Sequence, residues 1–332
     1  MTGTLVRWMP AMGRWLRRGL AAALLVPGGM AWAQAADCPP AAAMPGPEQL
    51  RTLLRGARDR GLLWRVEHGG RSSWLYGTVH TARLDWSVPG PTVLSALRGS
   101  DRLALELDLL DPAVLQALQQ GLRARPDAPP LPEDLERRLA AQRQAACAGP
   151  ELTGLRPEAQ VMALLALAGR REGLDPAYGI DAALAGTAKA LGKPVLGLET
   201  PERQLRELLS DDPVRATDSV RSGLEQLEGG GAGSKLSTIA QAWADGRLQL
   251  LESLPDWCHC MDSAAEREQY ARAIDGRNPA MAEAMVREMR AGRSVFVAVG
   301  ALHMVGPQGL PALLAAQGFQ PQRVQFPPPD RP

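Results

Sequence analysis

Two short hydrophobic runs that lie far apart in the chain end in the same pattern, a glycine followed three residues later by a histidine. The first run is SWLYGTVH at residues 73–80, and the second is SVFVAVGALH at residues 294–303. Both are rich in aromatic and β-branched residues, which is typical of buried strands. Glycine lets the backbone turn sharply after a strand, so the imidazole can fold back over the strand end. Since the chain has only four histidines, this repeat predicts that His80 and His303 occupy equivalent strand ends.

The rest of the chain alternates between short apolar runs and stretches with helical spacing. Residues 62–67 and 73–76 flank a Gly-Gly pair and predict a hairpin. Further strands are predicted at residues 103–107, 193–199, 295–299 and 323–326. Helices are predicted at residues 47–60, 92–97, 157–168, 181–191, 202–209, 236–251, 263–290 and 309–317. This alternation predicts an α/β fold with a mostly parallel central sheet and an antiparallel edge hairpin.

Three stretches add detail to that fold. The segment 111–191 is rich in Ala, Leu, Arg and Gln, and it predicts a large helical insertion that covers the sheet. The glycine-rich EGGGAGS at residues 228–234 predicts a flexible surface loop. The long helical stretch 263–290 contains Gly-Arg-Asn-Pro at residues 276–279, which predicts an interruption there.

Four of the predicted strands end at residues that can do chemistry. Besides the two histidines, one strand ends at Glu106 and Asp108, and another at Glu199. Ligands of parallel sheets bind beyond the carboxyl ends of the strands, so these side chains are expected at one edge. Two histidines and a carboxylate can hold a catalytic divalent metal and leave a position open for water. Such an ion lowers the pKa of water toward ~7, and a second carboxylate could accept the proton or orient a histidine.

Each of these residues also has a purely structural interpretation. A histidine at a strand end can cap or pack, and Glu106 could pair with an arginine such as Arg102. Glu199 could serve the helix that begins at Pro201, and Asp181 could cap the helix that it opens. The position of Arg277 in the helix interruption leaves two alternatives. It could reach over the site to hold a substrate carboxylate or carbonyl, or it could lie exposed on the surface. Trp243 and Trp257 are expected to pack rather than to form a binding platform.

The N-terminus predicts export. Residues 1–35 combine an arginine-rich start, the apolar run GLAAALLV and small-x-small cleavage patterns, which indicate a secretory signal peptide. An uncleaved anchor is the alternative. We expect a single domain over residues 36–326, a disordered tail at 327–332, and a periplasmic or secreted location. The net charge is +1, so no nucleic-acid-binding footprint is expected. The chain contains no Walker A loop, Rossmann fingerprint, G-x-S-x-G or H-E-x-x-H.

The four cysteines, Cys38, Cys147, Cys258 and Cys260, predict two disulfides in an oxidising compartment. A bond between Cys258 and Cys260 would close a very tight ring, so each is expected to pair with a distant partner. The alternative is that Cys258-His259-Cys260 forms a metal clip.

The ordered set of motifs resembles the TraB/GumN family, which is related to the Tiki proteins and to the EreA/ChaN-like superfamily. The matching pieces are LYGTVH (75–80), LALELD (103–108), YGID (178–181), GKPVLGLET (192–200), RN (277–278) and VAVGALHMVGPQGL (297–310).

The resemblance implies a Tiki-like α/β fold and metal-dependent peptidase chemistry on a peptide or protein substrate. It implies that His80, Glu106 and His303 hold a divalent metal, with Mn, Co and Zn as candidates. Glu199, Asp181 and Arg277 fall at matching positions and are the candidate catalytic residues. Two alternatives follow from other relatives: a haem-like ligand-binding protein, and a non-catalytic accessory protein associated with the cell envelope.

Overall fold

The computed structural model describes residues 38–326, and a six-stranded mixed sheet lies at its centre. The strand order is β4-β3-β5-β2-β1-β6. The strands are β1 (Leu62–His68), β2 (Arg71–Thr78), β3 (Arg102–Leu105), β4 (Val195–Gly197), β5 (Val295–Gly300) and β6 (Gln322–Val324). The β2–β5, β5–β3 and β3–β4 pairs are parallel, whereas β1 pairs antiparallel with β2 and β6. The predicted α/β fold, with its parallel core and antiparallel hairpin, is confirmed.

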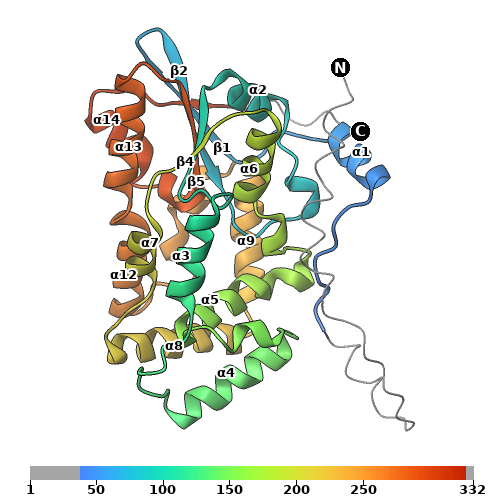
Figure 1. Ribbon diagram of the computed structural model, residues 1–332, viewed down its shortest axis with the longest axis vertical. Coiled ribbons are helices and arrows are strands. Elements are labelled where there is room, and N and C mark those ends of the chain that lie inside the picture. Colours follow the sequence, from blue (N-terminus) through green and yellow to red (C-terminus); the bar gives the residue numbers. More distant parts are fainter. Residues whose placement is uncertain (1–37, 327–332) are drawn as a thin grey trace.

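The four parallel strands all run away from the hairpin tip, so their carboxyl ends meet at one edge of the sheet. β5 lies between β3 and β2, and every residue from Val295 to Val299 is buried. This burial on both faces accounts for its continuous apolar sequence. In Figure 1 the hairpin tip stands at the top, and the carboxyl ends face the helices α3, α5, α8 and α4 below.

Helices enclose the sheet and build a second layer beyond its carboxyl edge (Figure 1). They are α1 (Pro47–Arg55), α2 (Pro91–Gly99), α3 (Pro112–Leu122), α4 (Glu133–Ala145), α5 (Pro157–Leu167), α6 (Ile180–Ala190), α7 (Pro201–Leu208), α8 (Pro213–Glu228), α9 (Ala232–Ala244), α10 (Leu248–Glu252), α11 (Leu254–Trp257), α12 (Ala264–Tyr270), α13 (Asn278–Arg290) and α14 (Leu310–Ala316). Their starts follow local sequence signals. Asp111 caps α3 before a proline in the first turn, and Ser263 forms a capping box with Glu266 at α12.

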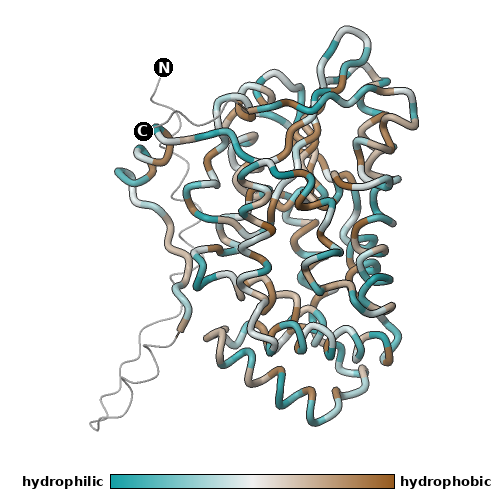
Figure 2. The backbone as a smooth tube through the Cα atoms, turned by 180° about the vertical axis from the view of Figure 1, so that it is seen from behind, coloured by the Kyte–Doolittle hydropathy of each residue, from teal (hydrophilic) through white to brown (hydrophobic). Residues whose placement is uncertain are grey.

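The helical insertion shares a core of its own with the later helix α8. Leucines and valines of α4, α5 and α8 pack together with Leu152, apart from the main core around the sheet. Figure 2 shows hydrophobic and hydrophilic residues alternating along these lower helices, as expected where one face packs and the other meets water. The Cys38–Cys147 disulfide ties the chain before α1 to this insertion across 109 residues. Closing a loop on the order of 100 residues contributes about 4.7 kcal/mol in the chain-entropy account.

The second disulfide contradicts the sequence prediction. Cys258 bonds to Cys260 and not to a distant partner. The intervening His259 adopts a φ of 48°, in the left-handed region, and this turn brings the two Cα atoms to 5.2 Å. The prediction failed because it assumed an ordinary backbone at His259.

Smaller differences concern element ends. The first helix stops at Arg55 instead of continuing to residue 60, and the glycine-rich loop shrinks to residues 229–231 because α8 and α9 extend into it. A π-helical turn, Ala271–Asp275, interrupts the predicted helix 263–290. The signal peptide at 1–35 and the tail at 327–332 lie outside the described residues. No helix within residues 38–326 combines the length and the hydropathy needed to cross a bilayer.

Candidate functional site

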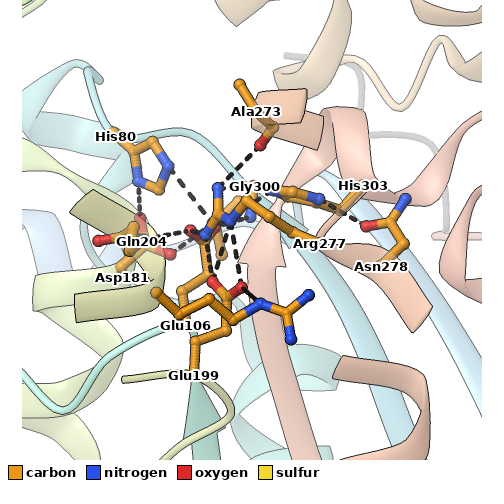
Figure 3. A network of polar contacts seen from close by, with 12 residues as sticks. His80, Glu106, Asp181, Glu199, Gln204, Ala273, Arg277, Asn278, Gly300 and His303 are labelled. Atoms are coloured by element: carbon orange, nitrogen blue, oxygen red, sulfur yellow. Dashed lines mark hydrogen bonds and ion pairs between the residues drawn. The ribbon is translucent and has the colours of Figure 1, made fainter. Parts of the chain in front are cut away.

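The two G-x-x-H histidines and Glu106 meet at the carboxyl ends of three neighbouring strands (Figure 3). Glu106 Oε1 lies 3.7 Å from His80 Nε2 and 3.8 Å from His303 Nε2. The backbone of Gly300 borders the same point. A Cβ on this glycine would lie 3.4 Å from Glu106 Oε1, 3.4 Å from His80 Nε2 and 3.5 Å from His303 Cδ2. The structure therefore brings together the two imidazoles and the carboxylate around a space that glycine leaves open.

His80 stands at the exposed side of this site, with 65% of its side chain accessible to solvent. Its Nδ1 lies 2.7 Å from Asp181 Oδ2, while Thr78 Oγ1 donates to Asp181 Oδ1 at 2.6 Å. Asp181 reaches this position because Gly179, two residues earlier, packs against the backbone of His80. A Cβ on Gly179 would meet the His80 carbonyl oxygen at 2.7 Å. The negative charge of Asp181 raises the pKa of His80 above its ordinary 6.5, although solvent screens the pair.

His303 is the buried counterpart, with 2% of its side chain exposed. Its Nδ1 lies 2.6 Å from Asn278 Oδ1, and Asn278 Nδ2 donates to the Gln308 carbonyl at 2.7 Å. This second bond fixes the amide so that its oxygen must accept from His303. We therefore assign the proton of the neutral ring to Nδ1, which leaves the Nε2 lone pair facing Glu106. Burial lowers the pKa of His303 to about 4, which keeps the ring neutral at physiological pH.

Glu106 is buried and fully hydrogen bonded. Its Oε1 accepts the Gly300 N–H at 2.9 Å, and its Oε2 accepts from Arg277 Nη2 at 2.5 Å and Gln204 Nε2 at 3.1 Å. Burial alone would raise the pKa of Glu106, but the positive charges of His80 and Arg277, with the Gly300 amide, outweigh it and lower the pKa to about 2. The carboxylate is ionised at any physiological pH.

Arg277 lies between two buried carboxylates, with 4% of its side chain exposed. Besides Glu106, it donates through Nε and Nη2 to Glu199 Oε2 at 3.0 and 2.5 Å. Its Nη1 donates to the Ala273 carbonyl at 3.0 Å and comes within 3.4 Å of His303 Nε2. Arg277 therefore lies within the site and not on the surface, and its contact with a substrate carboxylate or carbonyl stays a prediction.

The structural interpretations of the other candidates hold only in part. Arg102 pairs with Glu288 instead of Glu106. Glu199 does not cap α7, because the Thr200 hydroxyl accepts the N–H of the first turn. Its carboxylate is completely buried against Arg277. Asp181 does lie in the first turn of α6, as the structural interpretation allows, although it is not the N-cap, and its carboxylate also contacts His80. Of the strand-end residues, only Asp108 stays outside the site, where it accepts the Leu110 N–H at 2.9 Å.

Several contributors were missed by sequence reasoning. Asn278 was named only as the second residue of the RN pair. No role was predicted for Gln204 or Thr78. Gln204 had a usable signal, because α7 begins directly after Glu199 and its first turn must face the strand ends. Trp243 packs as expected and also donates from Nε1 to the Gly77 carbonyl at 2.5 Å, which supports the first G-x-x-H turn.

The charges of the site favour a cation. Glu106, Glu199 and Asp181 carry three negative charges, and Arg277 supplies the buried positive charge; Arg203 approaches Glu199 at 3.7 Å from the partly exposed side. With His80 protonated and His303 neutral, Arg277 and His80 offset two of the three negative charges, so a bound cation would have to replace the proton on His80. Within residues 38–326, no group of three or more His, Cys, Asp and Glu side chains is arranged so that it could hold a metal ion as it stands.

Comparisons with known proteins agree with the motif order. The family model for the TraB/PrgY/gumN family matches residues 62–323. YbaP of Shigella flexneri, described as uncharacterised, is 29% identical over 292 residues, which cover 80% of this chain and 98% of YbaP. YbaP of Escherichia coli K12 is 28% identical with the same coverage. No solved structure matches the chain. The chain thus belongs to the TraB/PrgY/gumN family.

Proposed function

We propose that this protein is an exported, divalent-metal-dependent hydrolase that cleaves peptides, and that His80, Glu106 and His303 hold the metal. The proposal depends on one observation. The Nε2 atoms of His80 and His303 both face Glu106 Oε1, at 3.7 and 3.8 Å respectively. Ligand atoms bound tetrahedrally at about 2.0–2.1 Å lie about 3.4 Å apart. The two Nε2–Oε1 distances are therefore slightly longer than those between the ligands of a bound ion. The His80 side chain is exposed, so it is free to move toward the metal.

The residues around the three ligands support the same interpretation. Metal-binding histidines usually donate their other ring N–H to a carboxylate or carbonyl, which fixes the tautomer. Asp181 does this for His80 and the Asn278 amide does it for His303. A bound Mn²⁺, Co²⁺ or Zn²⁺ would act as a Lewis acid and activate water for attack.

The remaining residues hold and polarise this arrangement. Glu199 is completely buried and paired with Arg277, so we assign it the positioning of Arg277 instead of proton transfer. Arg277 in turn orients Glu106, and its Nη1 is the cation nearest to His303 Nε2, at 3.4 Å. A guanidinium at this place can stabilise negative charge that develops on a substrate carbonyl oxygen. Asp181 positions His80.

Export is part of the proposal. It rests on the signal-like residues 1–35 and gains support from the two disulfides, which persist in oxidising compartments. The geometry favours a metal ion over haem, because both Nε2 atoms face an ionised carboxylate and not an open apolar slot. Peptides are proposed as substrates on the strength of the family resemblance.

A substitution at Gly300 tests the proposal with little damage to the fold. Gly300→Ala places a methyl group amid the three proposed ligands, at distances of ordinary van der Waals contact. We expect the wild type to bind about one ion per chain by elemental analysis and to cleave a peptide pool, as followed by mass spectrometry. Gly300→Ala should lose both properties.

Gly186→Ala on α6 is the matched control, because its added Cβ meets nothing within 4 Å. This variant should bind metal and cleave peptides as the wild type does. A Gly300→Ala variant that stays folded and keeps its metal, or a wild type whose cleavage survives complete chelation, would overturn the proposal.

A further inference from the structure

The Cys258–Cys260 disulfide belongs to a small apolar cluster that packs against the residue before His303 and against the helix that precedes the π-helical turn. Leu254, Cys258 and Met261 form its buried centre, and Tyr270 and Leu302 pack against it. Leu302 directly precedes His303. Tyr270 precedes the π-helical turn that leads to Asn278, the partner of the His303 Nδ1. The disulfide-bonded turn therefore packs against the residue before His303 and against the end of α12, from which the π-helical turn leads to Asn278.

The two sulfur atoms differ in their surroundings. Cys258 is completely buried, whereas Cys260 is partly exposed. The Cys260 N–H points at Cys258 Sγ from 3.1 Å. Hydrogen-bond donors stabilise a thiolate, so Cys258 is the better leaving sulfur and Cys260 the accessible point of attack. The left-handed conformation of His259 is uncommon for a residue other than glycine, and opening the ring releases this constraint.

We propose that Cys258–Cys260 is an exchangeable disulfide, and that its reduction by a dithiol loosens His303 and weakens the metal site. A thiolate of the dithiol attacks Cys260 Sγ, forms a mixed disulfide and releases the Cys258 thiolate, which takes up a proton. The second thiol of the reagent then displaces Cys260. Two electrons pass to the protein, and the reagent leaves as its own disulfide. The effect on metal affinity rests on the proposed function, whereas the exchange itself does not.

The other disulfide provides the contrast. Cys38–Cys147 ties the segment before α1 to the helical insertion, and neither cysteine belongs to the cluster around Leu302. Its reduction should affect the stability of the fold without altering His303. The double variant Cys38→Ser/Cys147→Ser leaves Cys258 and Cys260 as the only cysteines, so its response to a dithiol reports on this pair alone.

The test uses that variant in the full chain, equilibrated with increasing dithiothreitol, and three readouts. Alkylation and mass spectrometry measure the reduced fraction, near-UV circular dichroism follows tertiary structure, and Zn²⁺ titration gives the affinity. We expect both cysteines to become alkylated while tertiary structure persists, with a loss of Zn²⁺ affinity of about tenfold or more, the size typical of ligand supports. Reoxidation should restore the affinity.

Two outcomes would overturn the inference: a pair that resists reduction until the chain unfolds, or a reduced protein whose affinity stays within about twofold of the oxidised one. The variant Cys258→Ser/Cys260→Ser, with Cys38–Cys147 intact, provides the second arm. It should bind Zn²⁺ as weakly as the reduced protein, and addition of the dithiol should not change this affinity further. If the oxidised wild type binds no Zn²⁺, the proposed function fails. In that case, the imidazole ¹⁵N signals of His303 still show whether reduction of Cys258–Cys260 changes the surroundings of this ring.

Discussion

His80 and His303 end two neighbouring parallel strands in the same sequence frame, yet their surroundings are opposite. His80 is 65% exposed and is held by a charged carboxylate, Asp181. His303 is 2% exposed and is held by a neutral amide, Asn278. The first environment raises the pKa of its histidine and the second lowers it. One motif thus supplies both a solvent-facing imidazole with a raised pKa and a buried one that is neutral at physiological pH.

The difference shows how the proposed hydrolytic site would combine access with rigidity. The buried side, formed by His303, Arg277, Glu199 and Glu106, is fixed by ion pairs and hydrogen bonds in a region that excludes water. The exposed side depends on one aspartate and can move. We expect the buried side to control the stability of the fold and the exposed side to control ligand exchange.

The largest expected effect comes from removing the central charge of the buried side. Arg277→Met leaves Glu106 and Glu199 buried without their counter-ion, which costs about 3–5 kcal/mol of unfolding free energy. Urea denaturation of the metal-free protein measures it. The control is Arg138→Met, which breaks an ion pair with Glu228 that is 30–36% exposed and should cost at most about 1 kcal/mol. Equal losses in the two variants would remove the distinction between the sides.

Replacement of the two histidines should lower the unfolding free energy by different amounts. His303→Ala creates a cavity and leaves Asn278 without its partner, so the unfolding free energy should fall by about 2–4 kcal/mol. His80→Ala removes a mostly exposed ring and should change it by about 0.5 kcal/mol or less. Both variants should lose the metal. The comparison would be broken if His80→Ala destabilised the metal-free protein as much as His303→Ala does.

The pH dependence of stability should differ in sign between the two rings. The pKa of His303 falls from 6.5 to about 4 on folding, so the unfolded chain binds more protons between these values. The metal-free protein should lose up to about 3 kcal/mol as the pH drops through that window. The raised pKa of His80 acts oppositely: its stabilisation is present below pH 6.5 and is lost as the pH rises toward about 10. Exposure makes this second contribution smaller.

A pair of urea titration series over pH can check this. His303→Gln should flatten the stability profile between pH 4 and 6.5 relative to the wild type, and His80→Gln should flatten it only at alkaline pH. Profiles that run parallel to the wild type in both variants would contradict the assigned protonation states.

The smallest expected effect concerns the support of the exposed ring. Asp181→Asn keeps the shape of the Nδ1 contact but removes the charge that strengthens His80 as a ligand. Loss of such a support typically lowers metal affinity by about 10–100-fold, which competition with a chelating dye can measure. Asp108→Asn, outside the site, should leave the affinity unchanged. An Asp181→Asn protein with wild-type affinity would mean that His80 is not a ligand.

The positions of the strand ends could be predicted from the sequence because strand, glycine and histidine are local signals. His80, Glu106, Glu199 and His303 were all placed at one sheet edge in this way. Arg277 could not be placed, because the direction of a side chain at a helix interruption depends on the π-helical turn. In that turn, Gly276 N donates to the Ala271 carbonyl, and the Ala273 carbonyl accepts from Arg277.

Two other misses have the same cause. The Cys258–Cys260 bond requires a left-handed backbone conformation at His259. The residue type at this position does not predict that conformation. The partnership of Asn278 with His303 joins residues that are 25 positions apart, on a helix and a strand end, and only tertiary packing creates it. Local signals thus identified the side chains that could bind a metal, but not the residues that orient them.

The most direct test of the shared metal site is the imidazole ¹⁵N spectrum during titration with Zn²⁺. With one equivalent of Zn²⁺, the Nε2 signals of both His80 and His303 should shift to metal-bound values, whereas those of His68 and His259, the other two histidines, should not. A protein whose His80 and His303 signals stay in place while Zn²⁺ binds, or that binds no Zn²⁺, would contradict the account.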